Sequence, residues 1–354
     1  MKDFNLVEKS KQHAKDAGLV YVSDTQPGFS RGKKLRQGFQ YLDTKGKVLR
    51  NPAHLKRIHS LVIPPAWSSV WICVNPKGHL QVTGKDARGR NQYRYHPDWN
   101  KTRNEDKFSK ILLFAKKLPA IRARVKKDLH TSGMGRRRVL AAIVEIMEQT
   151  MIRIGNTEYA EKNDSYGLTT ILNKHAKVRG KSVHFSFVGK SGQKHEVDIV
   201  DPLLAKIVSR CQHLPGQELF AYVDEKGKVV DVGSQDVNNY LAEITDEHIT
   251  AKDFRTWGGT VHATRILQKL GPVEGKTAQK KTILRAIEQT SSHLRNTVAV
   301  CRKYYVHPCV IESYENGVLF EVHANCKKAG ARTSRGLYKD EVFALRLLEK
   351  ALKP

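Results

Sequence analysis

The stretch Thr250-Ala251-Lys252-Asp253-Phe254-Arg255-Thr256-Trp257-Gly258 marks the start of a long predicted helix. Thr250 and Asp253 have the spacing of a capping box, in which the two residues satisfy free backbone amides of the first turn. Apolar residues then recur at helical spacing until Gly271-Pro272 ends the pattern: Phe254, Trp257, Val261, Ile266 and Leu270. Because such a stripe packs one face of a helix into a core, the stretch predicts a helical domain, with Arg255 in the first turn of this helix.

A second helix and a β-hairpin are predicted earlier in the chain. Apolar residues over 140–151 follow a helical pattern, and Gly155 supplies a stop. Arg153 therefore lies at the end of a helix. Residues 183–200 have the pattern of two strands joined by a glycine-containing turn, which puts Lys190 at the tip of a hairpin.

The N-terminal third has a different pattern. Residues 70–74 are typical of a buried strand, residues 75–78 form a strong turn signal, and residues 80–83 return as a second strand. The predicted fold class is therefore α+β. A small β-rich domain is expected over residues 1–105, and a mostly α-helical domain that carries the hairpin is expected over 106–354.

The charge of the chain is strongly positive. Its 354 residues include 62 Lys and Arg against 35 Asp and Glu, a formal net charge of +27. Residues 31–60 hold nine of these cations against one acid, and residues 101–138 hold thirteen against three. A single lysine in such a run is usually just solvated, but a surplus this large favours contact with the phosphates of a nucleic acid.

Composition and short motifs exclude several other classes. No run of about 18 apolar residues could span a membrane, and the N-terminus lacks the apolar core of a secretory signal. The five cysteines form no CxxC pair, so we expect neither a disulfide framework nor a metal site, and a reducing cytoplasm is the expected compartment. The phosphate-binding GxxxxGK[ST] loop is absent as well.

Basic and aromatic residues alternate over 83–95. Cations and tyrosines together can grip a sugar-phosphate backbone, although a flexible surface loop is an equally good interpretation. The candidate nucleic-acid contacts in this stretch are Lys85, Arg88, Arg90, Gln92, Tyr93 and Tyr95.

Chemistry on a phosphodiester without a metal needs fixed cations around the oxygens, a nucleophile and an acid for the leaving group. The chain offers such groups at separate places: Arg153, Lys190, Arg255, and Asn296 nine residues before Tyr305. Each alone is weak, since arginines at helix ends are often surface residues and adjacent tyrosines are often packing residues.

The order of these motifs resembles that of type IB DNA topoisomerases, in their compact poxvirus-like and bacterial branch. The resemblance extends from about Val20 to about Cys326. It rests on Ile152-Arg153-Ile154-Gly155-Asn156, Phe187-Val188-Gly189-Lys190-Ser191-Gly192, Lys252-Asp253-Phe254-Arg255-Thr256-Trp257-Gly258, and Asn296-Thr297 followed by Cys301-Arg302-Lys303-Tyr304-Tyr305.

The resemblance implies a role for each motif residue. Tyr305 matches the nucleophile that forms a 3′-phosphotyrosyl bond, with the adjacent Tyr304 as the competing choice. Arg153 and Arg255 match the phosphate clamp, where a guanidinium binds two oxygens in one plane. Lys190 matches the general acid. Two further matches are Asn296, at a position where many relatives carry His, and Tyr159, at a DNA-contacting position that packing would explain equally well.

For the whole chain, the resemblance implies a clamp around duplex DNA that nicks one strand, relaxes supercoils by strand rotation and reseals. Neither ATP, a metal nor another cofactor is then needed. The enzyme is expected to be a monomer in the cytoplasm, at the bacterial nucleoid, with a viral particle as a possible alternative.

Two alternative functions remain open. Tyrosine recombinases and phage integrases share the helical catalytic fold, but they typically carry His three residues before the second arginine, where this chain has Lys252. The β-rich N-terminal half also differs from the helical domain usual in recombinases. An architectural DNA-binding protein without catalysis would need only the charge.

Overall fold

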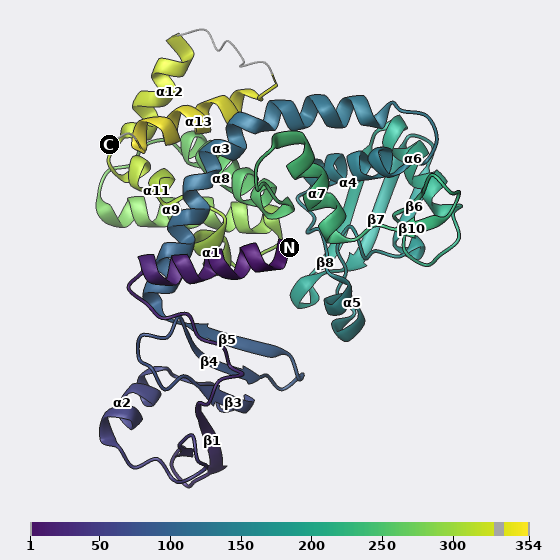
Figure 1. The fold of residues 1–354 in the computed structure, drawn as a ribbon. Helices are drawn as coiled ribbons and strands as arrows, with labels where there is room; N and C mark the ends of the chain where they lie inside the picture. Colours follow the sequence, from purple (N-terminus) through teal and green to yellow (C-terminus); the bar gives the residue numbers. More distant parts are fainter. Residues whose placement is uncertain (1, 329–335, 353–354) are drawn as a thin grey trace. The chain divides into compact units, whose positions relative to one another are not determined.

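The computed structural model describes residues 2–328 and 336–352 (Figure 1). Contacts divide the chain into two units, and the division falls between Phe108 and Ser109, inside one long helix. The predicted mixture of a β-rich N-terminal region and a helical C-terminal part is confirmed.

The N-terminal unit is built on a five-stranded antiparallel sheet with strand order β2-β1-β3-β4-β5. Its elements are α1 (Lys2–Asp16), β1 (Phe29–Lys34), β2 (Phe39–Leu42), α2 (Pro52–Ser60), β3 (Ser68–Ile72), β4 (Leu80–Lys85) and β5 (Asn91–Tyr95). The predicted hairpin over residues 70–83 is confirmed as β3 and β4, and Ile72 and Val82 pair across it, fully buried.

The stretch over residues 83–95 is not a flexible loop. Residues 91–95 form β5, which pairs with β4 in a second hairpin, with Thr83 opposite Tyr93 and Lys85 opposite Asn91. Only residues 86–90 form the turn between the strands. The loop interpretation was wrong because the alternation of polar and aromatic residues here is that of a strand with one exposed face.

The second unit is mostly helical and contains two small sheets. Its helices are α3 (Pro97–Leu129), which begins in the first unit, α4 (Arg136–Thr150), α5 (Thr157–Asn163), α6 (Pro202–Gln212), α7 (Ser234–Thr245), α8 (Ala251–Leu270), α9 (Lys276–Leu294), α10 (Val298–Tyr304), α11 (Pro308–Glu315), α12 (Val318–Lys328) and α13 (Lys339–Ala351). Its strands are β6 (Ala176–Arg179), β7 (Ser182–Val188), β8 (Lys194–Val200), β9 (Ala221–Val223) and β10 (Val229–Asp231). Single 3₁₀ turns are η1 (Asn173–His175) and η2 (Lys190–Gly192).

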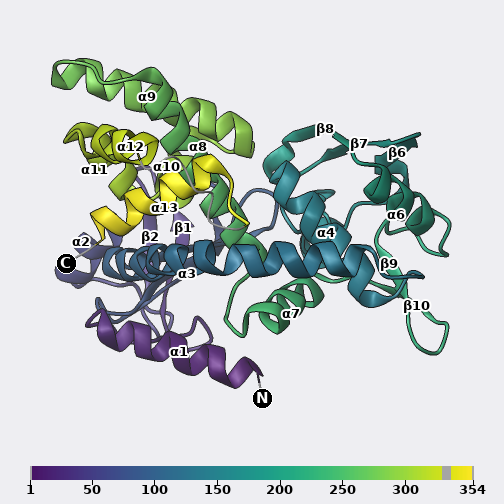
Figure 2. The ribbon, with the colours of Figure 1, turned by 90° about the horizontal axis from the view of Figure 1, so that it is seen from above.

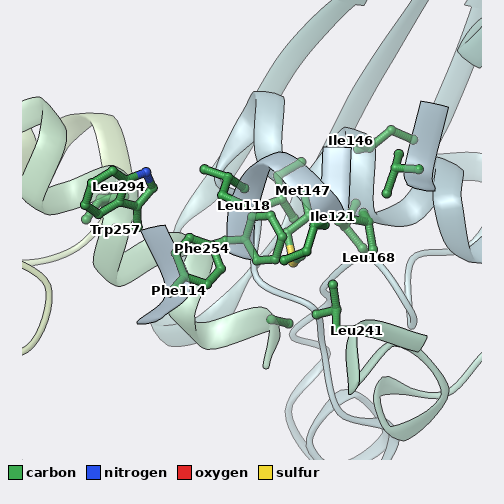
Figure 3. Close-up of a cluster of buried hydrophobic side chains, with 14 of the residues drawn as sticks. Phe114, Leu118, Ile121, Ile146, Met147, Leu168, Leu241, Phe254, Trp257 and Leu294 are labelled. Carbon is green, nitrogen blue, oxygen red and sulfur yellow. The ribbon is translucent and has the colours of Figure 1, made fainter. Parts of the chain in front are cut away.

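The core of this unit gathers apolar side chains from α3, α4 and α8 (Figure 3). Phe114 of α3 meets Phe254 of α8 edge-on, with ring centroids 4.9 Å apart. Leu118 and Ile121 continue the stripe along α3, and Met147 of α4 is fully buried in the same cluster. Each such side chain contributes about 1.5–3 kcal/mol through burial, so this core fixes the helices that carry the candidate site.

Helices α4, α7 and α13 lie around α3 (Figure 2), and polar contacts join each of them to it. Arg122 pairs with Glu148 of α4 and Glu341 of α13, and Tyr240 of α7 donates a 2.9 Å hydrogen bond to Asp128.

Among the described residues, no helix has the length and apolar character that crossing a bilayer requires.

Candidate active site

Arg255 lies in α8, near the start of the helix, as predicted. The carboxylate of Asp253 accepts hydrogen bonds from the backbone amide and hydroxyl of Thr250, which fixes the first turn. The Arg255 side chain is 3% exposed. Its Nη2 donates to the carbonyl of Leu294 at 2.8 Å, and its Nη1 donates to the carbonyl of Met151. One buried guanidinium thus joins the ends of α9 and α4.

Arg153 lies just beyond the end of α4, in the segment that follows Met151. Its backbone carbonyl accepts a 2.9 Å hydrogen bond from the amide of Leu168, which anchors the segment. Its Nη2 donates to Oδ1 of Asn296, a residue 143 positions away in sequence. Folding therefore brings two of the predicted site residues into direct contact.

Tyr305 follows the last residue of α10 and packs against α8. Its backbone carbonyl accepts a hydrogen bond from Oγ1 of Thr260 at 3.3 Å. A Cβ at Gly259 would lie 2.6 Å from that carbonyl oxygen, so only glycine permits this close approach. The guanidinium carbon of Arg255 stands 5.1 Å from the centroid of the Tyr305 ring. Helices α10 and α8 therefore fix the backbone of Tyr305 close to Arg255.

The charges around Tyr305 favour its ionised form. Burial by itself raises the pKa of the phenol, but the positive charge of Arg255, followed by that of Arg153, lowers it below its ordinary value. The guanidinium of Arg255 stands close to the phenol ring, and Lys252 adds a smaller effect in the same direction. Burial and the charge of Arg153 lower the pKa of Arg255 to about 10, so its guanidinium stays charged at neutral pH.

Three buried nitrogens of this group have no hydrogen-bond partner among the described residues: Nη1 of Arg153, Nε of Arg255 and Nδ2 of Asn296. A buried donor without an acceptor costs about 1–3 kcal/mol, and native structures keep few of them. All three are donors and two carry positive charge, so the group they would satisfy is an anion with several oxygens, such as a phosphate.

Lys190 lies at the hairpin tip between β7 and β8, as predicted, and it is exposed, in contrast to the buried Arg255. His195 of β8, which the sequence analysis missed, packs against Gly189 beside this tip. Burial, followed by the charges of Arg295, Arg153 and Arg255, lowers the pKa of His195 to about 4. Its only sequence signal is its place in the alternation of β8, which a packing residue would also satisfy.

The predicted contacts of the N-terminal unit divide between two faces of β5. Tyr93 and Tyr95 are 49% and 39% exposed and stack with ring centroids 6.2 Å apart. Gln92 lies on the other face, where its amide donates to Asp86 at 3.0 Å. Lys85 ends β4 with an exposed side chain.

The turn before β5 is organised by Asp86, which the sequence analysis did not recognise as a partner. Its carboxylate accepts hydrogen bonds from Nε of Arg90 at 2.7 Å and from the backbone amide of Arg88 at 2.9 Å. The hydrogen bond from Arg90 is the main cause that lowers the pKa of Asp86 to about 2.

Tyr159 belongs to α5, and its side chain is outside the part of the chain that the structure describes.

Comparisons with known proteins agree on one family. The family described as "Eukaryotic DNA topoisomerase I, catalytic core" matches residues 96–329, and the family described as "Bacterial DNA topoisomerase IB, N-terminal domain" matches residues 38–86. The DNA topoisomerase 1B of Acanthamoeba polyphaga mimivirus is 31% identical over 296 residues, which cover 81% of this chain and 87% of that protein. The DNA topoisomerase I of Monkeypox virus is 25% identical over 252 residues, or 69% of this chain and 75% of that protein.

The chain therefore belongs to the type IB DNA topoisomerase family. The family resemblance stated from the sequence motifs is confirmed, and with it the enzyme class, an isomerase of DNA topology.

Proposed function

We propose that this enzyme relaxes supercoiled duplex DNA by cutting and rejoining one strand through Tyr305. The observation that carries the proposal is the partly buried group in which Tyr305 lies against Arg255, while three buried donor atoms of Arg153, Arg255 and Asn296 lack acceptors among the described residues. A DNA phosphate placed there would satisfy these donors with its nonbridging oxygens. The phenolate would then be the nucleophile at the phosphorus.

In the proposed reaction, one bond to phosphorus forms as another breaks. The phenolate oxygen of Tyr305 bonds to phosphorus, and the bond from phosphorus to the 5′-oxygen breaks, which leaves a 3′-phosphotyrosyl link. Lys190 donates a proton to the departing 5′-oxygen. Arg153 and Arg255 stabilise the charge on the transition state, and Asn296 donates a hydrogen bond to a nonbridging oxygen. After the free end has rotated, the reverse reaction reseals the strand, so no ATP, metal or other cofactor is consumed.

The division of labour between the two units is also a proposal. We infer that the N-terminal unit binds DNA, that the second unit carries the chemistry, and that together they enclose the duplex. The matches of the bacterial N-terminal domain and of the catalytic core to these regions support this, as does the net charge of +27. Tyr159 is proposed as a further DNA contact. The protein would act as a monomer on cytoplasmic DNA, at a bacterial nucleoid or, alternatively, in a viral particle.

The experiment is relaxation of a supercoiled plasmid in EDTA without ATP, together with denaturant trapping of covalent protein–DNA adducts. Wild type should relax the plasmid and form a 3′ adduct, and Tyr305→Phe should do neither. Tyr304→Phe is the matched control, because it removes the hydroxyl of the adjacent tyrosine, and it should stay active. Relaxation by Tyr305→Phe would refute the nucleophile assignment.

The same assay separates the two alternative functions. A recombinase would exchange strands between two defined sites with little relaxation. An architectural protein would bind the plasmid and give no adduct at all.

A further inference from the structure

His195 lies directly beneath the hairpin tip that carries Lys190. It pairs with Phe187 across β7 and β8, and the two rings stack with centroids 4.7 Å apart and an interplanar angle of 7°. A Cβ at Gly189 would lie 2.7 Å from Nε2 of His195, so the backbone of the tip rests on the imidazole. Gly189 is the residue immediately before Lys190, and its amide donates to the carbonyl of Gln193 at 2.8 Å, which closes the turn.

The imidazole of His195 also lies close enough to three arginines for their charges to affect its pKa. His195 is 2% exposed, and its pKa falls to about 4, first through burial and then through the charges of Arg295, Arg153 and Arg255. The imidazole is therefore uncharged at neutral pH. Arg295 in turn donates to the backbone carbonyl of Glu196 at 3.3 Å, so β8 is tied to the residue that precedes Asn296.

Packing alone does not explain why the ring at position 195 is an imidazole, which has polar nitrogens. Nδ1 of His195 is buried and has no hydrogen-bond partner among the described residues. A buried nitrogen without a partner destabilises the fold, whereas a phenyl ring could stack on Phe187 without that cost. Nε2 lies next to Gly189, and the charges that act on the ring are the positive charges of three arginines. A neutral imidazole can lie beside them and offer a polar atom without adding a further positive charge.

We infer that His195 is a positioning residue for the general acid. Its neutral ring holds the tip formed by Gly189 and Lys190 against the cluster of Arg153, Arg255 and Arg295, so that the Lys190 ammonium reaches the leaving 5′-oxygen. The inference rests on the proposed role of Lys190, and it assigns no contact between His195 and the DNA.

The test compares two leaving groups at one phosphate. A duplex is made with the ordinary 5′-oxygen or with a bridging 5′-sulfur at a cleavage position mapped beforehand by adduct trapping. A thiolate leaves without a proton because a thiol is far more acidic than an alcohol, so the sulfur substrate bypasses the acid. Single-turnover cleavage is measured for wild type, Lys190→Ala and His195→Phe, with His195→Ala as a second variant and melting temperatures as the folding control.

His195→Phe should fold with an unchanged or higher melting temperature. It should cleave the oxygen substrate about 100-fold more slowly, since a displacement of the acid by about 1 Å costs a factor of this size. On the sulfur substrate it should return close to the wild-type rate, as Lys190→Ala should. His184→Ala is the matched control, because His184 lies on the solvent-facing side of the same hairpin and pairs with Asp198 at 2.9 Å. It should cleave both substrates at the wild-type rate.

The outcomes distinguish this inference from the function on which it rests. The ring does not act through Lys190 if both His195 variants remain slow on the sulfur substrate, or if His195→Phe is fully active on the oxygen substrate. Either result overturns the inference about His195 and leaves the proposed function of the enzyme intact. If Lys190→Ala also stays slow on sulfur, the assignment of the acid fails and the inference fails with it.

Discussion

The cations of the two units differ in what they contact. Arg255 is 3% exposed and keeps its Nε without a partner among the described residues. Arg90 of the first unit is more exposed, and its guanidinium forms an ion pair of 2.6 Å with Asp86. In the second unit, the positive charge of Arg255 has no carboxylate partner among the described residues and is available to bind an anion. In the first unit, Asp86 already neutralises part of the charge of Arg90.

This difference separates two uses of a net charge of +27. The guanidinium of Arg255 is buried and bonded to the ends of α4 and α9, and this fixed geometry suits the stabilisation of a transition state. The exposed Lys85 of β4 and the exposed tyrosines of β5 suit salt-dependent binding of a polyanion, which needs little geometric accuracy. Substitutions in the two units should therefore affect different steps.

The largest expected effect is at Arg255. Arg255→Lys keeps the charge but loses the planar guanidinium that contacts Met151, Leu294 and the phenol of Tyr305. Single-turnover cleavage should fall by about 10²–10³-fold, the usual cost of one lost oxyanion donor, while the Kd for duplex DNA stays nearly unchanged. Adduct trapping and a filter-binding titration measure the two quantities. An equal loss in both would mean that buried and exposed cations are not functionally distinct.

A smaller effect is expected in the pH dependence of cleavage. With the phenolate as the proposed nucleophile, the rate should rise with pH as Tyr305 loses its proton. It should level off below the ordinary pKa of tyrosine, since Arg255 and Arg153 lower the pKa. Arg153→Ala removes one of these charges, so the midpoint should move to higher pH. The sulfur substrate is used for the profile because its leaving group needs no proton from an acid. A midpoint that does not move would show that Arg153 does not influence the phenol.

Much of the local structure could be predicted from the sequence. The capping residues Thr250 and Asp253, the helix that follows them and the hairpin that carries Lys190 all depend on residues within a few positions of one another. The contact between Arg153 and Asn296 could not be predicted from spacing, because it joins positions 143 residues apart. Family resemblance named these two residues, and only the fold shows that they touch.

Other parts of the site could not be predicted for the opposite reason, since their signals were local but ambiguous. His195 occupies a buried position in a strand, where any apolar residue would fit the alternation equally well. Asp86 counts simply as one acid among many cations, although its carboxylate organises the whole turn between β4 and β5. Charge counts alone do not show which cations are already paired.

The smallest effect distinguishes cations within the first unit. Arg90→Gln removes a charge that Asp86 partly neutralises, whereas Lys85→Gln removes an exposed charge from the end of β4. If both positions face DNA, Lys85→Gln should reduce the slope of log K against log salt concentration by about 1, the value for one lost phosphate contact. Arg90→Gln should reduce it by less, because Asp86 already holds the guanidinium, and neither should change the rate of cleavage in the bound complex. Binding titrations at several salt concentrations give the slopes. Equal slopes for the two variants would show that the ion pair with Asp86 does not weaken the contact of Arg90 with DNA.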